Sequence, residues 1–254
     1  MDDISKRKKY SEAQQTALVT QVNRVCPLCA RALFYQKKNR SYKDYELAHI
    51  YPLNPTSEEK ELLKNEERLS EDVNDEKNII PLCKICHGQF DTPRTVDEYR
   101  DLLAVKKRLI ARTNQEQMWN EYKIEEEISE VIKALYNDPD VNASSQIDFT
   151  PKKVDDKLNA TITNLTKRKV KNNVRDYYLF VKGSLSSLDQ KYQDLSEVIS
   201  YQVKTYYLKQ KGMGITQQEI FENVVAWLNV KTKPETPEST EILASFYVQN
   251  CEIF

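Results

Sequence analysis

The chain has few of the residues that interrupt helices, with only four glycines and nine prolines among 254 residues. A β-sandwich or barrel needs many tight turns, so this scarcity argues against an all-β fold and favours helix. No apolar run approaches the roughly 20 residues that span a membrane. The charged beginning, MDDISKRKKY, lacks the apolar core of a signal peptide. The sequence therefore predicts a mainly α-helical protein that is cytoplasmic and has no membrane partner.

An excess of positive charge is also missing, because 38 lysines and arginines are offset by 39 aspartates and glutamates. A protein that holds DNA tightly by itself usually carries a basic excess. If this chain acts on DNA, either its basic residues are clustered locally or partner proteins help it to bind.

Cysteine and histidine are rare but concentrated in one region. Of five cysteines and two histidines, four cysteines and both histidines fall between residues 26 and 87. The four cysteines form two C-x-x-C pairs, Cys26/Cys29 and Cys83/Cys86. One such pair can be a redox motif, but two pairs can complete a closed tetrahedral site, which predicts a structural Zn²⁺.

Apolar spacing and capping signals predict helices over residues 11–25, 96–110, 115–136 and 237–254. A helix with Leu195, Val198, Ile199, Val203 and Tyr206 on one face is expected to end at Gly212 and Gly214. Thr216 and Glu219 predict a capping box for the helix that follows. Residues 45–51 read as a strand, and a helix is expected to begin near the second cysteine pair. Residues 56–76 fit either a helical insertion or a solvated loop.

The motifs of the N-terminal part resemble those of the HNH endonuclease family in its four-cysteine form. The resemblance rests on the first cysteine pair, on Glu46-Leu-Ala-His49-Ile-Tyr-Pro52, and on Asn78-Ile-Ile-Pro-Leu-Cys83-x-x-Cys86-His87-x-x-x-Asp91. It covers roughly residues 22–95. It implies a small ββα-metal domain that hydrolyses DNA phosphodiester bonds with a catalytic divalent cation, Mg²⁺ or Mn²⁺.

The resemblance also implies roles for three residues: His49 as the general base, Asn78 as the residue that orients the nearby backbone, and His87 as a ligand of the catalytic ion. Asp91 lies four residues after His87, on the same helical face, and is a second candidate ligand. Its alternative is an ordinary surface acid.

Many family members have an acidic residue or a histidine directly before the base, where this chain has Ala48. Glu46 is expected on the same face of the strand and is a candidate substitute ligand. The alternative for Glu46 is a surface strand residue. If nothing replaces the ligand, the domain is a structural zinc module without activity.

Basic residues follow the first cysteine pair: Arg31, Lys37, Lys38, Arg40 and Lys43, with Tyr35 and Tyr42 among them. They either contact the DNA backbone or belong to a solvated hairpin. No residue set suggests reading of bases, so little sequence specificity is expected.

The last segment, from about residue 174, resembles the C-terminal domains of effectors in ABC-three-component bacterial defence systems, also called Lamassu-type. The resemblance rests on Ser200-Tyr-Gln-Val-Lys-Thr, Ile215-Thr-Gln-Gln-Glu-Ile-Phe with Val225-Ala-Trp-Leu, and Phe246-Tyr-Val-Gln-Asn-Cys-Glu-Ile-Phe254. It implies a complex with an SMC-like ABC ATPase and a small middle subunit, and we expect homo-oligomers on activation. The alternative is a generic helical domain whose tyrosines and phenylalanines form its core. Cys251 is expected to be a small buried hydrophobe and not a nucleophile, because this half of the chain has no histidine.

Three segments are therefore expected: an HNH nuclease domain over residues 1–112, a helical connector with a polar linker over 113–171, and a helical partner-docking domain over 172–254. The leading hypothesis is an anti-phage HNH DNase regulated by its partners. The alternatives are a non-catalytic zinc-binding module of such a complex and a stand-alone HNH enzyme of restriction type.

Overall fold

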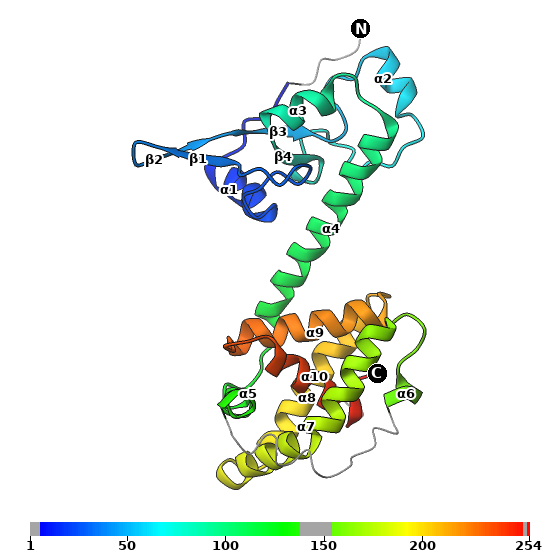
Figure 1. Cartoon of the computed structure of the whole chain (residues 1–254). Helices are drawn as coiled ribbons and strands as arrows, with labels where there is room; N and C mark the ends of the chain where they lie inside the picture. The colour runs from blue at the N-terminus through cyan, green and yellow to red at the C-terminus, as the bar shows by residue number, and fades with distance from the viewer. Residues whose placement is uncertain (1–5, 138–153, 251–252) are drawn as a thin grey trace. The chain divides into compact units, whose positions relative to one another are not determined.

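The computed structural model describes residues 6–137, 154–250 and 253–254, and the chain divides into two compact units, Met1–Asn114 and Gln115–Phe254 (Figure 1). Helices dominate the described residues, which contain two sheets of two strands each. The expected fold class, mainly α with a small HNH domain and a helical C-terminal domain, is confirmed. No helix in the described ranges is both long and apolar enough to cross a membrane.

The first unit is built from short elements: α1 (Glu12–Gln21), β1 (Phe34–Lys37), β2 (Arg40–Lys43), β3 (Tyr45–His49), α2 (Ser57–Leu62), the 3-10 turn η1 (Glu76–Asn78), β4 (Ile79–Cys83), α3 (Lys84–Asp91) and α4 (Val96–Glu121). β1 and β2 form a hairpin, and β3 pairs with β4 in antiparallel register from Tyr45↔Cys83 to His49↔Ile79. α3 contacts both β3 and β4. This ββα arrangement brings residues from the two cysteine regions together.

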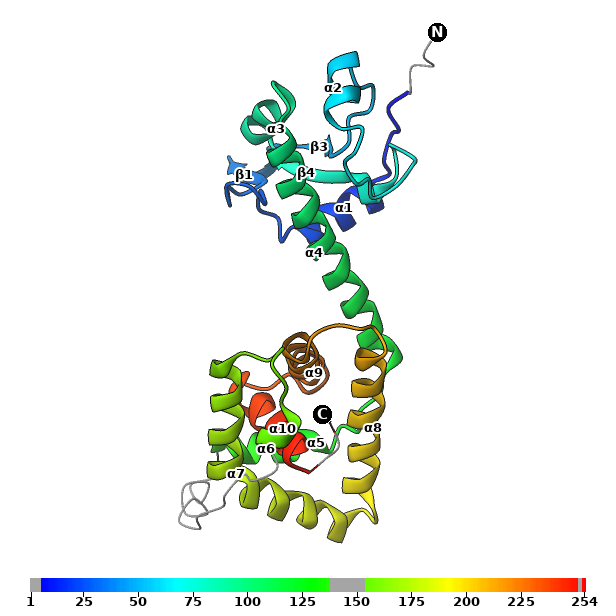
Figure 2. The same ribbon diagram turned by 90° about the vertical axis from the view of Figure 1, so that its right-hand side faces the viewer.

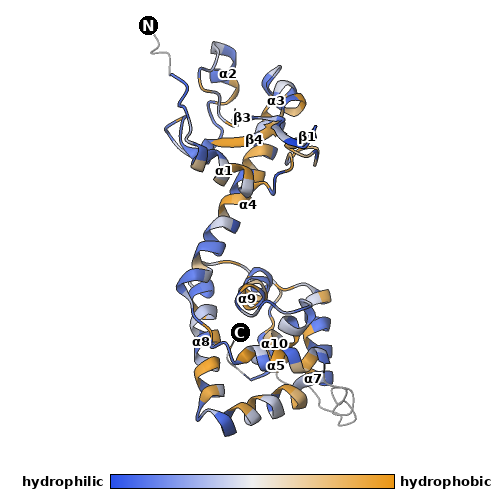
Figure 3. Cartoon of the chain, turned by 90° about the vertical axis from the view of Figure 1, so that its left-hand side faces the viewer, coloured by the Kyte–Doolittle hydropathy of each residue, from blue (hydrophilic) through white to orange (hydrophobic). Residues whose placement is uncertain are grey.

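The strand pair has its apolar side in the core of this unit. Ala48, Ile80 and Leu82 are fully buried and belong to one hydrophobic cluster. All five residues of β4 are buried, and Figure 3 shows this strand in the hydrophobic colour. The continuous apolar run of β4 follows from its burial on both faces.

α1 begins as the sequence predicts and ends early. Ser11 caps the helix, and the side chain of Gln14 accepts from the Ser11 backbone in a capping box. The helix ends at Gln21 and does not extend to residue 25. Asn23 and Arg24 have φ angles of 54° and 62°, a left-handed conformation that cannot continue an α-helix.

The sequence predicted a break between residues 110 and 115, and that position is wrong. α4 continues without a break to Glu121, and α5 (Ile128–Asn137) starts after an irregular turn. In that turn, the Tyr122 carbonyl accepts from Trp227 Nε1 at 3.2 Å and the Glu125 N–H donates to Gln202 Oε1 at 2.9 Å. The side chains of Gln202 and Trp227 thus form hydrogen bonds with backbone groups that would otherwise take part in the hydrogen bonds of a continuous helix.

The second unit contains α5, α6 (Val154–Lys157), α7 (Asn164–Lys191), α8 (Leu195–Lys211), α9 (Gln217–Thr232) and α10 (Glu238–Gln249). α10 lies in the middle, against α5, α7 and α9 (Figure 2). The predicted end of α8 at Gly212 and the Thr216–Glu219 capping box of α9 are confirmed. The expected inward face of α8 is right except at Val198, which is exposed.

The polar linker expected up to residue 171 is too long. α7 begins at Asn164, and Leu158, Ile162 and Val170 are buried in the core of the second unit. Polar and charged residues separate these apolar positions, so the sequence pattern resembled a linker. In the folded unit the other helices cover them, and they belong to the core. Residues 138–153 of that expected linker and Cys251 lie outside the described residues.

Candidate active site and four-cysteine metal site

The four cysteines meet at one point. The Sγ atoms of Cys26, Cys29, Cys83 and Cys86 all lie within 4.8 Å of one another, and Cys29 Sγ is 3.7 Å from Cys83 Sγ. Thiolates held tetrahedrally at a Zn–S distance of about 2.3 Å are about 3.8 Å apart. Burial and the neighbouring sulfurs raise the pKa of the Cys86 thiol, so a cation is needed to hold four thiolates here. The donor set and its spacing fit a structural zinc ion.

Local backbone structure places each cysteine pair. In the first, the Cys26 N–H donates to the Arg31 carbonyl at 2.7 Å, and the chain turns at Ala30, whose φ is 58°. In the second, Cys83 is the N-cap of α3, and its Sγ accepts from the Cys86 N–H at 3.5 Å. The first pair therefore precedes the β1–β2 hairpin, and the second pair spans the end of β4 and the start of α3.

His49 is the last residue of β3, and its side chain is enclosed. The residue is 7% exposed, and Nε2 is buried with no hydrogen-bond partner among the described residues. Burial lowers the pKa of His49, and a hydrogen bond with Asn74 raises it by a smaller amount. The imidazole is therefore neutral near pH 7, and its enclosed Nε2 has no hydrogen-bond partner among the described residues.

Asn78 connects the two strands next to this histidine. Its Oδ1 accepts from the Tyr51 N–H at 2.8 Å, and its Nδ2 donates to the carbonyls of Tyr51 at 2.9 Å and Val73 at 2.8 Å. Its own carbonyl accepts from the Ile50 N–H at 2.9 Å. These contacts fix the segment that directly follows His49.

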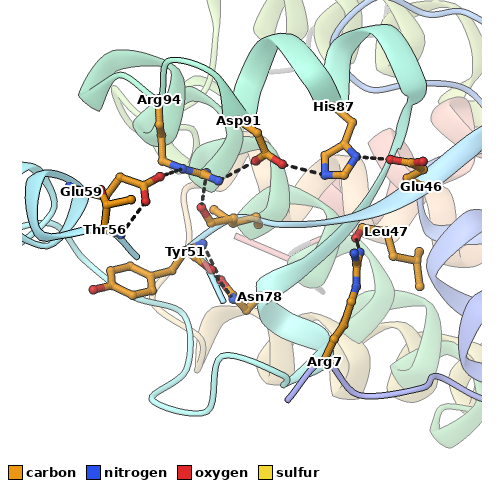
Figure 4. A network of polar contacts seen from close by, with 11 residues as sticks. Arg7, Glu46, Leu47, Tyr51, Thr56, Glu59, Asn78, His87, Asp91 and Arg94 are labelled. Carbon is orange, nitrogen blue, oxygen red and sulfur yellow. Dashed lines mark hydrogen bonds and ion pairs between the residues drawn. The ribbon is translucent and has the colours of Figure 1, made fainter. Parts of the chain in front are cut away.

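His87 lies between two carboxylates (Figure 4). Its Nδ1 is 2.5 Å from Glu46 Oε2, and its Nε2 is 3.0 Å from Asp91 Oδ2. The hydrogen bond to Asp91 raises the pKa of His87 and, with the smaller effect of Glu46, outweighs burial. Burial opposes ionisation of Asp91, but His87 and Arg94 outweigh it and lower the pKa of this carboxyl.

The structure thus brings Glu46, His87 and Asp91 together, as the sequence led us to expect. Among the described residues, the four cysteines are the only group of three or more Cys, His, Asp or Glu side chains that is arranged to hold a metal ion. The two carboxylates contact different nitrogens of the same ring, so His87 separates them.

Arg94 is a site residue that sequence reasoning missed. Its side chain is 4% exposed and donates to the Ile50 carbonyl at 2.9 Å, to Asp91 Oδ1 at 2.6 Å and to Glu59 Oε1 at 3.3 Å (Figure 4). It also lies over the Phe90 ring, 4.4 Å from the ring centroid. One guanidinium therefore joins α2, the end of β3 and the end of α3. The only sequence signal was an arginine three residues after Asp91, the usual spacing of a helical ion pair.

Ala48, where many family members have a metal ligand, is fully buried in the apolar cluster. Glu46, two residues earlier, reaches His87 from the more exposed end of the strand. Position 48 thus contributes packing to the site, and the carboxylate on this strand comes from Glu46.

The five basic residues near the first cysteine pair, Arg31, Lys37, Lys38, Arg40 and Lys43, are all exposed. Four of them lie on the β1–β2 hairpin or its turn. Lys43 donates to Gln15 Oε1 at 3.0 Å, so one of its contacts is within the protein.

Comparison with known families assigns both parts of the chain. The model of the HNH endonuclease family matches residues 26–96, and the model of C-terminal domain 11 of the ABC-three component (ABC-3C) systems matches residues 115–254. No curated protein and no solved structure matches the chain. The second match covers more than half of the chain and includes every described helix of the second unit. The chain therefore belongs to the family of ABC-three component proteins that carry C-terminal domain 11, and its N-terminal part is an HNH endonuclease domain.

Proposed function

We propose that this chain is a metal-dependent DNA endonuclease and the effector of a bacterial ABC-three-component defence system, of Lamassu type. The observation that carries the proposal is the environment of His49. A neutral imidazole ends β3, and its buried Nε2 has no hydrogen-bond partner among the described residues. The domain belongs to a family that is named for its nuclease activity. His49 and Asp91 are close enough for each to affect the pKa of the other.

The roles of the side chains follow from these contacts. His49 takes a proton from the attacking water, since a neutral imidazole is a suitable general base near pH 7. Asn78 holds the backbone after His49, so the ring keeps its orientation. A bound Mg²⁺ or Mn²⁺ would neutralise the phosphate and stabilise the leaving oxygen.

The number of ring nitrogens limits how His87 can bind that ion. A ligating histidine presents one nitrogen to the metal and donates its other N–H to an outer acceptor. Only one of the two carboxylates can therefore share an ion with His87. Asp91 faces Nε2 and interacts with His49, so we assign His87 and Asp91 as the ligands. Glu46 faces Nδ1 and orients the ring, in place of the ligand role that the sequence suggested for it.

The balanced charge of the chain supports a role for partners. With no basic excess, the nuclease gains local concentration on DNA by association with a DNA-sensing ATPase. The ABC-three component domain supports partner subunits, here an SMC-like ABC ATPase and a small middle subunit, docked through residues 172–254. We propose that the complex keeps the cytoplasmic nuclease inactive until foreign DNA is sensed, when it is released or oligomerises.

Arg31, Lys37, Lys38, Arg40 and Lys43 are the proposed contacts to the DNA backbone. Contacts to phosphates carry no sequence information by themselves. The nuclease is therefore expected to cut with little sequence specificity.

Plasmid cleavage with Mg²⁺ or Mn²⁺ tests this function, with the wild type and His49→Ala each assayed alone and with the ATPase and middle subunit. The substitution should lower the cleavage rate by about 100-fold or more while zinc content and helical signal stay unchanged. No cleavage in any condition by a folded, zinc-bound protein would support the non-catalytic module instead. Full activity of the chain alone, unaffected by the partners, would contradict the regulatory part of the proposal.

A further inference from the structure

The β1–β2 hairpin has one face that combines aromatic rings with positive charge. Its register pairs Tyr35 with Tyr42 and Lys37 with Arg40. Directly paired residues share a face, and residues two apart on a strand do as well. The two tyrosines and the two cations therefore lie on the same face of the hairpin.

The tyrosine rings stack on each other and remain open to solvent. Their centroids are 5.3 Å apart with an interplanar angle of 18°, and the residues are 49% and 40% exposed. Aromatic pairs of this size usually lie in a core or an interface. Here each ring covers one face of the other and leaves its outer face uncovered by that partner.

The charge around this pair is of one sign. Residues 30–43 contain five lysines and arginines and no aspartate or glutamate. The side chains of Lys37, Lys38 and Arg40 form no ion pair or hydrogen bond with any residue that the structure describes. The turn between the strands is Lys38–Asn39, with φ angles of 48° and 59°, so a third cation projects from the tip.

The base of the hairpin is held by the rest of the first unit. Leu33 is fully buried, and Phe34 packs edge-on against Tyr45 at 5.5 Å and lies beneath Arg24 at 5.1 Å. Figure 1 shows the hairpin extending away from β3 and β4. The strand after it ends at His49, seven residues beyond Tyr42, which is at most about 25 Å of chain.

From this arrangement we infer that the hairpin is a binding site for single-stranded DNA, which rests on the proposed function as a DNA nuclease and names its substrate class. An unpaired base stacks on the Tyr35–Tyr42 pair, while Lys37, Lys38 and Arg40 contact its flanking phosphates. Duplex DNA offers the same phosphates but no free base face, and aromatic platforms beside basic residues are typical of single-strand binding. The stacked nucleotide lies some distance from the bond that is cut, so the hairpin sets which DNA reaches His49.

The test measures binding of the full chain by fluorescence anisotropy, without added divalent ion, to labelled oligo-dT of about 20 nucleotides and to a duplex of equal length. The double variant Tyr35→Ser/Tyr42→Ser should weaken binding of oligo-dT about ten-fold or more and change duplex binding by less than about two-fold. The double variant Tyr35→Phe/Tyr42→Phe keeps the rings and should bind as the wild type does. Tyr192→Ser removes an exposed tyrosine of the second unit and should have no effect.

The triple variant Lys37→Ala/Lys38→Ala/Arg40→Ala should lower the salt dependence of oligo-dT binding, with a decrease of about 2 in the log–log slope. Equal weakening of single-stranded and duplex binding by the tyrosine substitutions, or no weakening, would overturn the inference. His49→Ala separates this inference from the proposed function. If the wild type fails to cleave and both proteins bind oligo-dT through the hairpin, only the nuclease proposal fails.

Discussion

Nε2 of His87 lies 3.0 Å from Oδ2 of Asp91, one turn further along α3. The opposite nitrogen of the ring faces Glu46. An ion bound at one ring nitrogen of His87 can therefore be shared by only one of the two carboxylates. Substituting each carboxylate in turn shows which one binds the ion.

Asp91→Asn should weaken binding of the catalytic ion more than Glu46→Gln does. In the proposed site the first removes a ligand charge, while the second alters a residue that orients His87, a change that typically costs 10- to 100-fold in affinity. The Mn²⁺ concentration needed for half-maximal cleavage gives both values. If Glu46→Gln raised this concentration more than Asp91→Asn, Glu46 would be the ligand.

The structural zinc should determine whether the first unit folds. Cys29 is exposed, so Cys29→Ser removes a ligand without creating a cavity. We expect less than one zinc per chain and rapid proteolysis within residues 6–114, because binding of such an ion supplies folding free energy. Metal analysis and limited proteolysis monitor both effects. Unchanged protease resistance in the zinc-depleted variant would contradict this role.

The acid limb of the cleavage profile should lie below the ordinary histidine pKa of about 6.5. In the proposed mechanism cleavage requires neutral His49, and burial lowers its pKa, so activity should be lost only as the pH falls below that value. Single-turnover rates at saturating Mn²⁺ between about pH 5 and pH 8 measure the limb.

Arg7 provides a check on this assignment. Its charge also lowers the pKa of His49, so Arg7→Gln should move the acid limb upward. An acid limb at or above the ordinary histidine pKa, or one that does not move in Arg7→Gln, would show that a group other than His49 causes it.

Arg94→Ala should destabilise the first unit by about 3 kcal/mol, since it leaves Glu59, Asp91 and the Ile50 carbonyl without a buried cationic partner. Arg100→Ala is the matched control. Arg100 pairs with Glu66 at 2.6 Å but is 60% exposed, and solvent screening leaves such an exposed pair with little effect on stability. Urea unfolding followed in the first unit compares them. Equal effects of the two substitutions would show that Arg94 is not a buried clamp.

Lys106→Met should stabilise the first unit near neutral pH. Lys106 is almost fully buried and donates to Gln21 Oε1 at 2.7 Å, and burial lowers its pKa to about 8. Below that pH the folded state contains a charged buried amine, which costs up to about 3 kcal/mol. The cost falls as pH rises from the folded pKa toward the unfolded one, because both states then become neutral.

The gain from Lys106→Met should therefore be larger at about pH 7 than at about pH 10, as measured by urea unfolding of both proteins at each pH. Loss of the hydrogen bond to Gln21 reduces the gain equally at both values. A gain that does not depend on pH would indicate that Lys106 stays charged in the fold.

The sequence by itself determined the features that depend on short spacing. Two C-x-x-C pairs specified the four-sulfur cluster, and the i, i+4 interval placed His87 beside Asp91. Capping residues such as Ser11 and Thr216 located helix starts, because the bonds that define a cap are made within three residues.

Tertiary structure alone decided the features that depend on distant neighbours. α4 runs through the expected boundary and stops where Trp227 and Gln202 bind its continuation. The apolar residues between 154 and 171 became core because other helices cover them. Ala48 packs inward while Glu46 reaches His87, and Arg94 joins three elements whose proximity no local pattern encodes. Local hydrogen bonds and i, i+4 contacts can be read along the chain, whereas burial and long-range pairing arise only once the chain has folded on itself.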